Sequence, residues 1–198
     1  MSKDNKHPPN TQAGHLNDEQ LAERAALGER AALSQLVERY HTPLLGYLFR
    51  LVYGDRALAE DLVQETFVHV LRQNSYQASR PFKPWLYAIA TNLVRDYFRS
   101  SASHPTQSIE DDPRLDLQDT SPNPEELAQA ADQGLEVMLA LQQLGHEYRA
   151  VLLLRYYQSL SLQEIADALE LPLGTVKSRL SVGTHRLRDL LLALKEEA

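Results

Sequence analysis

Apolar side chains recur every three or four positions through two long stretches of the chain, residues 17–100 and 125–195. This spacing places them on one face of successive amphipathic helices, whereas a half-buried strand would alternate apolar and polar residues. No such alternation is sustained along the sequence. The pattern therefore predicts an all-α fold made of two small helical domains.

Caps and helix breakers divide these stretches into shorter helices. In the first stretch we expect helices over residues 17–28, 30–41, 43–53, 56–72 and 82–99, with Pro43 opening the third. In the second we expect helices from 125 to about 141 and over 146–158, 161–170 and 172–193. The inward positions of the 56–72 helix are predicted to be Leu58, Leu62, Val63, Thr66, Val70 and Leu71, and those of the 82–99 helix Leu86, Ile89, Ala90, Leu93 and Tyr97.

The segment between the two stretches has a different composition. Residues 101–124 read SASHPTQSIEDDPRLDLQDTSPNP, with many Ser, Pro and acidic residues and few apolar anchors. This predicts a flexible, self-repelling acidic linker. The predicted organisation is a disordered tail (1–16), a first helical domain (17–100), the linker (101–124) and a second helical domain (125–198).

The charge of the chain is concentrated in that linker. The net charge is −7, and the seven acids and one arginine between Ser101 and Glu126 account for −6 of it. The two helical domains are therefore nearly neutral overall, so local basic surfaces remain possible. An acidic total still argues against strong binding to DNA by the chain alone.

Composition also indicates the compartment. The sequence contains no cysteine, which excludes disulfides and thiolate metal sites and fits a reducing cytosol. The first 16 residues lack the apolar core of a signal peptide, and the longest apolar runs, AVLLL and LLLAL, are too short to cross a bilayer. We expect a cytoplasmic protein without membrane attachment.

A helix-turn-helix pattern begins at Ser161. The order Ser161-Leu-Gln-Glu164 is a capping box, in which each side chain can accept a hydrogen bond from the other residue's backbone amide. The short helix ends at Glu170-Leu-Pro172, and Pro172 suits the first turn of a second helix. A short capped helix, a tight turn and a longer basic helix are typical of DNA-binding proteins.

The second helix separates into an apolar and a polar face. Leu173, Val176, Leu180, Gly183, Leu187 and Leu191 share the inward face. Small uncharged residues follow the opposite face, where they could meet base edges in a major groove, and cations flank them on both sides. The predicted DNA-binding residues are Gly174, Thr175, Lys177, Ser178, Arg179, Ser181, His185 and Arg186, with Arg188 beside them. The alternative is a solvated amphipathic helix whose arginines pair with nearby acids.

A second basic segment lies in the first domain. Residues 80–100 combine four bases, one acid and five aromatic residues. Aromatic faces and cations together suit strand-separated DNA, because bases stack on the rings and phosphates pair with the charges. By spacing alone, however, Phe82 and Trp85 are better explained as core residues than as a stacking platform.

The sequence offers little support for catalysis or cofactor binding. Asp61, Glu65 and His69 follow one another at one-turn spacing, but the second Glu-x-x-His motif of a ferritin-like metal site is absent. Their acids are better explained as a docking face or a solvated face. The sequence GxxxxGK[ST], a nucleophile elbow and a Ser-His-Asp grouping are also absent. We expect no enzymatic activity, no cofactor and no metal.

Three motifs together resemble a known family. AEDLVQETFVHVLR (59–72), PFKPWLYAIATNLVRDYFR (81–99) and SLQEIADALELPLGTVKSRL (161–180) are similar, in this order and separation, to the alternative sigma factors of bacterial RNA polymerase. The small two-domain extracytoplasmic-function (ECF) group matches best. The resemblance covers residues 17–100 and 125–193.

The resemblance implies a role for each motif. Asp61, Gln64 and Glu65 would contact the largest subunit of core RNA polymerase. The second helical domain would bind the −35 promoter element through the residues given above. The loop over 73–85 would take up a base flipped out of the −10 element, and the helix after it would bind adjacent DNA. The −10 and melting residues would be Asn74, Ser75, Tyr76, Phe82, Trp85, Asn92, Arg95 and Arg99.

The resemblance also implies partners. They would be core polymerase, promoter DNA and an anti-sigma protein, with the free chain a monomer. The sequence departs from the family at Val182 and near Thr184, where relatives often carry a basic residue. Two other classes stay open: a conventional helix-turn-helix regulator with an unrelated helical domain, and a helical adaptor that binds only protein. The regulator leaves the WLYAIATN segment and the acidic linker unexplained, and the adaptor leaves the basic face of residues 172–188 unexplained.

Overall fold

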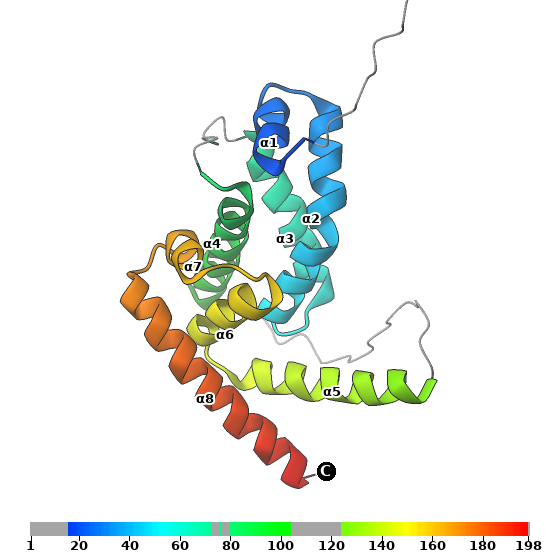
Figure 1. Cartoon of the computed structure of the whole chain (residues 1–198), viewed down its shortest axis with the longest axis vertical. Coiled ribbons are helices and arrows are strands. Elements are labelled where there is room, and N and C mark those ends of the chain that lie inside the picture. The colour runs from blue at the N-terminus through cyan, green and yellow to red at the C-terminus, as the bar shows by residue number, and fades with distance from the viewer. Residues whose placement is uncertain (1–15, 73–75, 77–79, 104–123, 198) are drawn as a thin grey trace, which may run out of the picture.

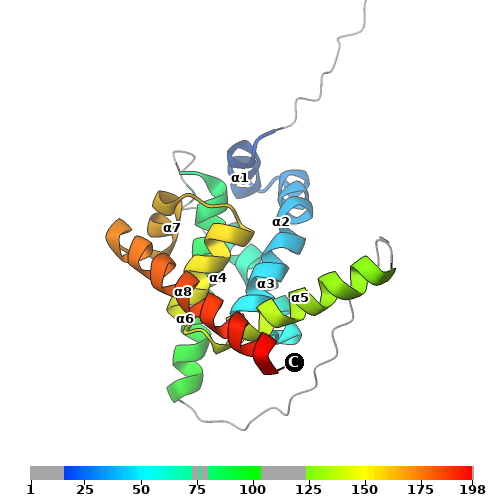
Figure 2. The same cartoon turned by 60° about the horizontal axis from the view of Figure 1, so that its bottom comes forward.

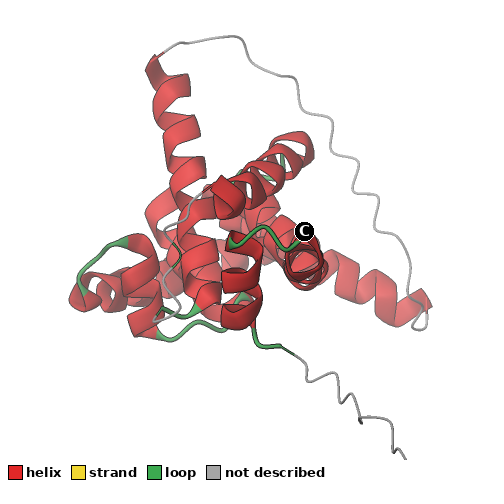
Figure 3. Cartoon of the chain, turned by 90° about the horizontal axis from the view of Figure 1, so that it is seen from above, coloured by secondary structure: helices red, strands yellow, loops and turns green. Residues whose placement is uncertain are grey.

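The computed structural model describes residues 16–72, 76, 80–103 and 124–197, and every regular element in these ranges is a helix (Figures 1 and 3). The first region contains α1 (Asp18–Ala26), α2 (Arg30–Leu51), α3 (Arg56–Arg72) and α4 (Phe82–Ser103). The second contains α5 (Pro124–Gln143), α6 (His146–Leu152), the π-helical turn η1 (Leu153–Tyr157), α7 (Leu162–Leu169) and α8 (Leu173–Glu197). The all-α prediction is confirmed. Residues 1–15 of the predicted tail and 104–123 of the predicted linker lie outside the described residues, and the ends of the predicted linker, 101–103 and 124, belong to α4 and α5.

Helix α1 begins at a reciprocal cap. The side chain of Asn17 accepts a hydrogen bond from the backbone amide of Gln20, and the side chain of Gln20 accepts one from the amide of Asn17. The two bonds satisfy amides that have no partner within the helix. Leu21, Ala22 and Ala25 are then buried, and this face packs mainly on α2.

Residues 30–51 form one helix, which corrects the predicted division at Pro43. Proline has no backbone N–H and usually ends or kinks a helix. Here the residues on both sides of it share one buried stripe, so a break would expose apolar surface at positions on either side. That stripe consists of Ala32, Leu36, Tyr40, Leu44, Tyr47, Leu48 and Leu51.

The inward faces of α3 and α4 are rotated slightly from those predicted. In α3, Leu62, Val63, Thr66 and Val70 are buried as expected, but Leu71 is 46% exposed. In α4, Leu86, Ile89 and Ala90 are buried, but Tyr97 is 42% exposed. Their places in the core are taken by Ala59 and Phe67 on α3 and by Phe82, Tyr87, Thr91 and Val94 on α4. Helix α4 has more neighbours than one amphipathic stripe implies, because α2, α3 and α7 all pack against it.

The predicted helix over 146–158 changes geometry along its length. It is α-helical as α6 and continues as the π-helical turn η1. The wider turn leaves Leu153 and Leu154 buried while Tyr156 and Tyr157 face outward. Such π segments are uncommon and often lie near functional sites.

The two helical regions are packed against each other. Helix α4 lies beside α7, and α2 contacts α5, α6 and η1 (Figures 1 and 2). The buried residues of both regions form one continuous hydrophobic cluster. The pattern of apolar positions predicted two domains but did not predict this shared interface.

The guanidinium of Arg149 contacts both regions and is fully buried. Within the second region it donates to the carbonyl oxygens of Leu141 (2.6 Å), Gln142 (2.9 Å) and Leu144 (2.6 Å). It also donates to the Leu51 carbonyl of the first region at 3.2 Å. Burial lowers the pKa of Arg149, and carbonyl groups at the end of α5 offset the cost of burying its charge.

Candidate nucleic-acid and polymerase-binding surfaces

Helices α7 and α8 form the helix-turn-helix predicted from the sequence. Ser161 Oγ accepts from the amide of Glu164 at 3.2 Å, and the Glu164 carboxylate accepts from the amide of Ser161 at 2.7 Å. Helix α7 ends at Glu170, whose φ of 54° lies in the left-handed region and turns the chain sharply. Pro172 then precedes α8, and its carbonyl accepts from the amides of Thr175 and Val176. The capping box and the turn are both confirmed.

The predicted outer face of α8 is accessible. Val176 and Gly183 are buried beneath the helix, and Gly183 lies close to Tyr148 and Leu152 of α6. Gly174 has open space where a side chain would lie, which leaves its backbone free to approach a ligand. The other predicted DNA-binding residues are exposed or half-exposed: Thr175, Lys177, Ser178, Arg179, Ser181, His185 and Arg186.

Two arginines of α8 already have neighbours. The guanidinium of Arg186 lies 4.6 Å from the centre of the Tyr148 ring, a cation–π distance. Arg188 approaches the His185 ring at 3.3 Å and the Asp189 carboxylate at 3.6 Å. These exposed contacts are weak and leave both cations able to pair with phosphate.

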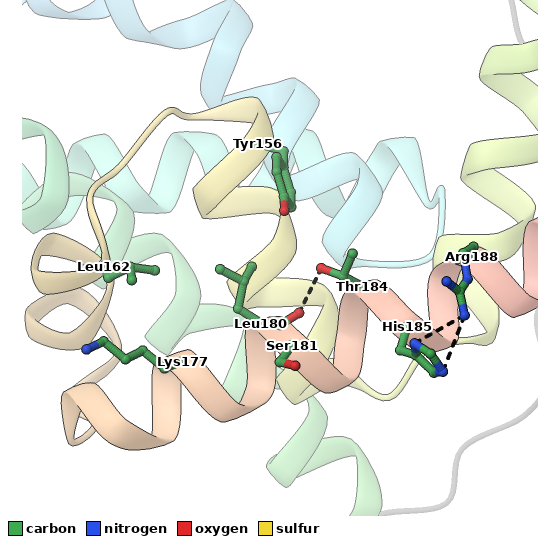
Figure 4. Close-up of a pocket in the computed structure, with 8 residues that line it drawn as sticks. All are labelled: Tyr156, Leu162, Lys177, Leu180, Ser181, Thr184, His185 and Arg188. Atoms are coloured by element: carbon green, nitrogen blue, oxygen red, sulfur yellow. Dashed lines mark hydrogen bonds between the residues drawn. The ribbon is translucent and has the colours of Figure 1, made fainter.

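A hollow of about 390 Å³ lies between η1, α7 and α8 (Figure 4). Its α8 wall carries two cations, Lys177 and Arg188, together with the hydroxyls of Ser181 and Thr184. Tyr156 of η1 forms the opposite wall and is 62% exposed. Tyr156 is not among the residues predicted from the sequence. The prediction took residues 146–158 as an ordinary helix and assigned the binding face of α8 from helical periodicity alone. The two adjacent tyrosines in RYYQ (155–158) were the sequence feature that could have indicated an aromatic side chain beside α8.

The predicted −10 residues lie around α4 and the segment before it. Phe82 is fully buried and packs edge-on against Tyr40 and Tyr76, with centroid distances of 5.4 and 5.7 Å. Trp85 is half-buried, 4.9 Å from the Tyr76 ring. Burial raises the pKa of Tyr76 to about 12, so its hydroxyl stays protonated. In this arrangement Phe82 belongs to the core, whereas Tyr76 and Trp85 are partly accessible. Asn74 and Ser75 lie outside the described residues.

The polar residues of α4 differ in accessibility. Arg95 and Arg99 are exposed, and Arg99 donates to Asp96 at 2.9 Å. Asn92 is half-buried, and its Oδ1 is shielded from solvent without a hydrogen-bond partner among the described residues. A shielded amide oxygen without a partner raises the free energy of the state that contains it.

His146, at the start of α6, packs against α4. Its ring lies 6.3 Å from that of Phe98, and its Nδ1 is shielded without a hydrogen-bond partner in the described part of the chain. Burial lowers the pKa of His146, and the positive charges of Arg149, Arg95 and Arg179 lower it further, against a smaller opposing effect of Glu147.

The predicted polymerase-binding residues share one exposed face of α3. Asp61, Gln64 and Glu65 are all exposed, and Glu65 lies 3.9 Å from His69. Within the described ranges, no group of three His, Cys, Asp or Glu side chains is close enough to hold a metal ion. The structure thus places the accessible predicted residues on α3, on and just before α4, and on α8, whereas Phe82 is in the core and Asn74 and Ser75 lie outside the described residues.

None of the helices that the structure describes combines the length and apolar character needed to cross a membrane. The fold and the surfaces define a two-region helical protein with a helix-turn-helix in its second region.

Comparison with known proteins identifies the family. Residues 36–104 match sigma-70 region 2, and residues 134–183 match sigma-70 region 4. The RNA polymerase sigma-H factor of Pseudomonas aeruginosa is 31% identical over 91% of this chain and 97% of its own length. The ECF sigma factor SigL of Mycobacterium tuberculosis is 36% identical over 83% and 91%. The longer ECF sigma factor SigE of Mycolicibacterium smegmatis is 35% identical over 84% of this chain and 65% of its own length.

Two solved structures are similar in fold to this chain. CnrH in complex with the cytosolic domain of CnrY has a TM-score of 0.61 and 28% identity, over 89% of this chain and 97% of that one. The sigma factor RpoE of Bartonella quintana, bound to the anti-sigma factor NepR, also has a TM-score of 0.61; at 24% identity it supports the fold. The chain belongs to the ECF family of bacterial RNA polymerase sigma factors. The readings as a conventional regulator or a protein-only adaptor are therefore wrong.

Proposed function

We propose that this alternative sigma factor binds core RNA polymerase through the acidic face of α3 and carries it to promoters with two DNA-binding surfaces. Asp61, Gln64 and Glu65 would form the centre of the polymerase contact, because they are exposed together and have few competing partners of their own. The chemistry of RNA synthesis would belong to the polymerase, and the complex would act in the cytoplasm.

The −35 element would lie across α8. The observation that carries this assignment is the exposed strip of small residues along α8 between two rows of cations, on a chain whose net charge is −7. The strip lets the helix enter a major groove, and the cations reach the phosphates on both sides. Lys177, Arg188 and the hydroxyl of Tyr156 surround the hollow beside α8 and would hold one backbone phosphate.

The −10 element would be bound by α4 and the preceding loop. Arg95 and Arg99 supply exposed positive charge, and Tyr76 and Trp85 supply partly accessible rings on which an unstacked base could lie. Melting would use the free energy of base capture. An anti-sigma protein is a further partner, since structurally similar proteins have been solved bound to such partners.

A titration tests this function. The labelled full-length chain is mixed with bacterial core RNA polymerase, first without DNA and then with promoter fragments selected by the resulting complex. We expect saturable one-to-one binding to core, and promoter binding by the complex that exceeds binding by the free chain. Failure to bind core, together with sequence-specific DNA binding by the free chain, would overturn the proposal.

A further inference from the structure

Helix α1 lies outside the match to sigma-70 region 2, which begins at residue 36, and the proposed function gives it no role. It nevertheless packs against α2, α3 and α4. In its first turn, half-buried Glu19 reaches across to α4, where a carboxylate oxygen accepts from the backbone amide of Phe82 at 3.0 Å. The start of α4 therefore depends on a residue 63 positions earlier in the chain.

The start of α4 uses an acceptor from outside its own helix. Phe82 is the first residue of α4, and the first amides of a helix have no partner within it. Helices usually satisfy amides of the first turn with a side-chain oxygen of the residue just before, but that residue is Pro81, whose side chain has no acceptor. A carboxylate at this end also interacts favourably with the helix dipole. Glu19 thus caps α4 from another helix.

The capped residue supports an aromatic platform, formed by Tyr76, Phe82 and Trp85. Phe82 is fully buried, and its ring centre lies 5.7 Å from that of Tyr76 and 5.8 Å from that of Trp85. The Tyr76 and Trp85 rings lie 4.9 Å apart and are half-buried. These two rings are the ones proposed to receive an unstacked base, and they pack on Phe82, so the position of Phe82 sets theirs.

The residue next to Glu19 anchors α1 to α2. Asp18 accepts from the guanidinium of Arg39 at 2.7 Å and from the hydroxyl of Tyr40. Burial and the Asp18 carboxylate raise the pKa of Tyr40, so this hydroxyl remains a donor. The Tyr40 ring in turn packs edge-on against Phe82, with ring centres 5.4 Å apart. Phe82 is therefore held twice, through its amide by Glu19 and through its ring by Tyr40.

We propose that Glu19 is a positioning residue for the −10 element: by capping α4, its carboxylate holds the aromatic platform ready for an unstacked base. The use of the platform for DNA rests on the proposed function, whereas the cap rests on contacts within this chain. Without the cap the first turn of α4 would open more often, and base binding would have to order Phe82 and Trp85 again. Glu19 itself would not touch the DNA.

Two neutral replacements of similar size separate the hydrogen bond from the charge. Glu19→Gln keeps a side-chain oxygen that can accept from the Phe82 amide, whereas Glu19→Leu has no acceptor. Glu23→Ala, one turn further along α1, is the matched control. Burial, together with the charges of Glu19 and Glu23, raises the pKa of Tyr76, so Glu23 places a similar charge near the platform. Its exposed carboxylate makes no hydrogen bond within the described ranges.

Two measurements follow the platform and its use. Trp85 is the only tryptophan of the chain, so the fluorescence of the free full-length protein reports on the platform. The holoenzyme formed with core polymerase is then titrated with two labelled probes taken from the promoter fragment that it selects. One probe is a single strand carrying the −10 element, and the other is a duplex carrying the −35 element alone. Circular dichroism checks folding, and Glu19→Ala replaces Glu19→Leu if the latter does not fold.

We expect Glu19→Leu to shift the Trp85 emission to longer wavelength and to lower affinity for the −10 strand about tenfold. Its affinities for core polymerase and for the −35 duplex should stay unchanged. Glu19→Gln should lose less than about threefold in affinity for the −10 strand, because it keeps the acceptor. Glu23→Ala should match the unmodified chain in both measurements.

Three results would overturn the inference. Unchanged affinity of Glu19→Leu for the −10 strand would show that base binding does not depend on the cap. A loss of affinity without a change in Trp85 emission would mean that Glu19 acts elsewhere than on the platform. Equal losses in Glu19→Leu and Glu19→Gln would assign the effect to charge. Failure of the unmodified holoenzyme to bind the −10 strand would instead refute the proposed function and this role with it, while Trp85 emission would still show whether Glu19 holds the platform.

Discussion

Replacing Arg149 with Met tests the most deeply buried charge among the residues that the structure describes. The guanidinium is fully buried, and it donates four hydrogen bonds to backbone carbonyls, three of them in residues 141–144. Methionine has a similar length but no donor. The substitution therefore leaves acceptors at the end of α5 without a partner inside the core.

The expected loss in the free energy of unfolding follows from those four hydrogen bonds. A hydrogen bond to a charged group contributes about 1.5–3 kcal/mol, and an acceptor left buried without a partner costs about 1–3 kcal/mol. Against this, Met avoids the cost of burying a charge, which the lowered pKa of Arg149 reflects. Because the bonds are not additive, we expect a loss of about 3–5 kcal/mol in the free energy of unfolding. For a chain of this size that lowers Tm by about 10 °C.

Chemical and thermal unfolding followed by circular dichroism measure the loss. Arg56→Met is the matched control, because Arg56 is 66% exposed and, in the part of the chain that the structure describes, pairs with Glu60 alone, on its own helix. It should change stability by less than about 0.5 kcal/mol. If Arg149→Met destabilised the chain by less than about 1 kcal/mol, the argument that these carbonyls depend on the guanidinium would be wrong.

Three further predictions concern single sites on the chain. Arg179→Ala should weaken initiation that depends on the −35 element about tenfold, because in the proposed complex this half-buried cation would lie at the edge of the groove, and promoter occupancy of the holoenzyme measures it. Asp61→Ala combined with Glu65→Ala should lower affinity for core polymerase at least about fivefold with unchanged helicity, whereas Glu38→Ala on the exposed face of α2 should not. The lowered pKa of His146 means that the unfolded chain binds more protons below the ordinary pKa of about 6.5, so unfolding free energy should fall as pH drops through 6.5. The His146→Gln variant should lose less over the same range, as denaturant titrations at several pH values would show.

Each of these has an outcome that contradicts it. Unchanged occupancy with Arg179→Ala would move the DNA-binding surface away from that side of α8. Core affinity equal to that of the unmodified chain would place the polymerase contact elsewhere than on α3. Parallel pH curves for the His146 variant and the unmodified chain would mean that the imidazole titrates equally well in both states.

Local features of the fold could be read from the sequence because short-range interactions decide them. Ser161 and Glu164 satisfy each other's amides within one turn, so the start of α7 needs no information from the rest of the chain. Pro43 shows the opposite case. Its missing N–H predicts a break, but buried residues on both sides keep α2 continuous, and only the packed neighbours reveal that.

The candidate binding surfaces could be predicted from the sequence only where a regular helix carries them. The outer strip of α8 follows from helical periodicity over residues 172–191, and its members are exposed or half-exposed as expected. Tyr156 was missed because a π turn changes which side chains point outward, and periodicity assumes constant geometry. Phe82 shows that an aromatic among cations is ambiguous, since its ring packs with Tyr40 and Tyr76 in the core.

The interface between the regions could not be predicted at all, for a physical reason. In the sequence Gln158 is one polar residue at the end of a helix and Arg149 one cation on a helix, and neither differs from a solvent-exposed residue of the same type. Their roles arise because backbone carbonyls of Leu51 and Pro43, about a hundred positions earlier, happen to lie within reach. Apolar periodicity records which face of a helix is buried but not what buries it.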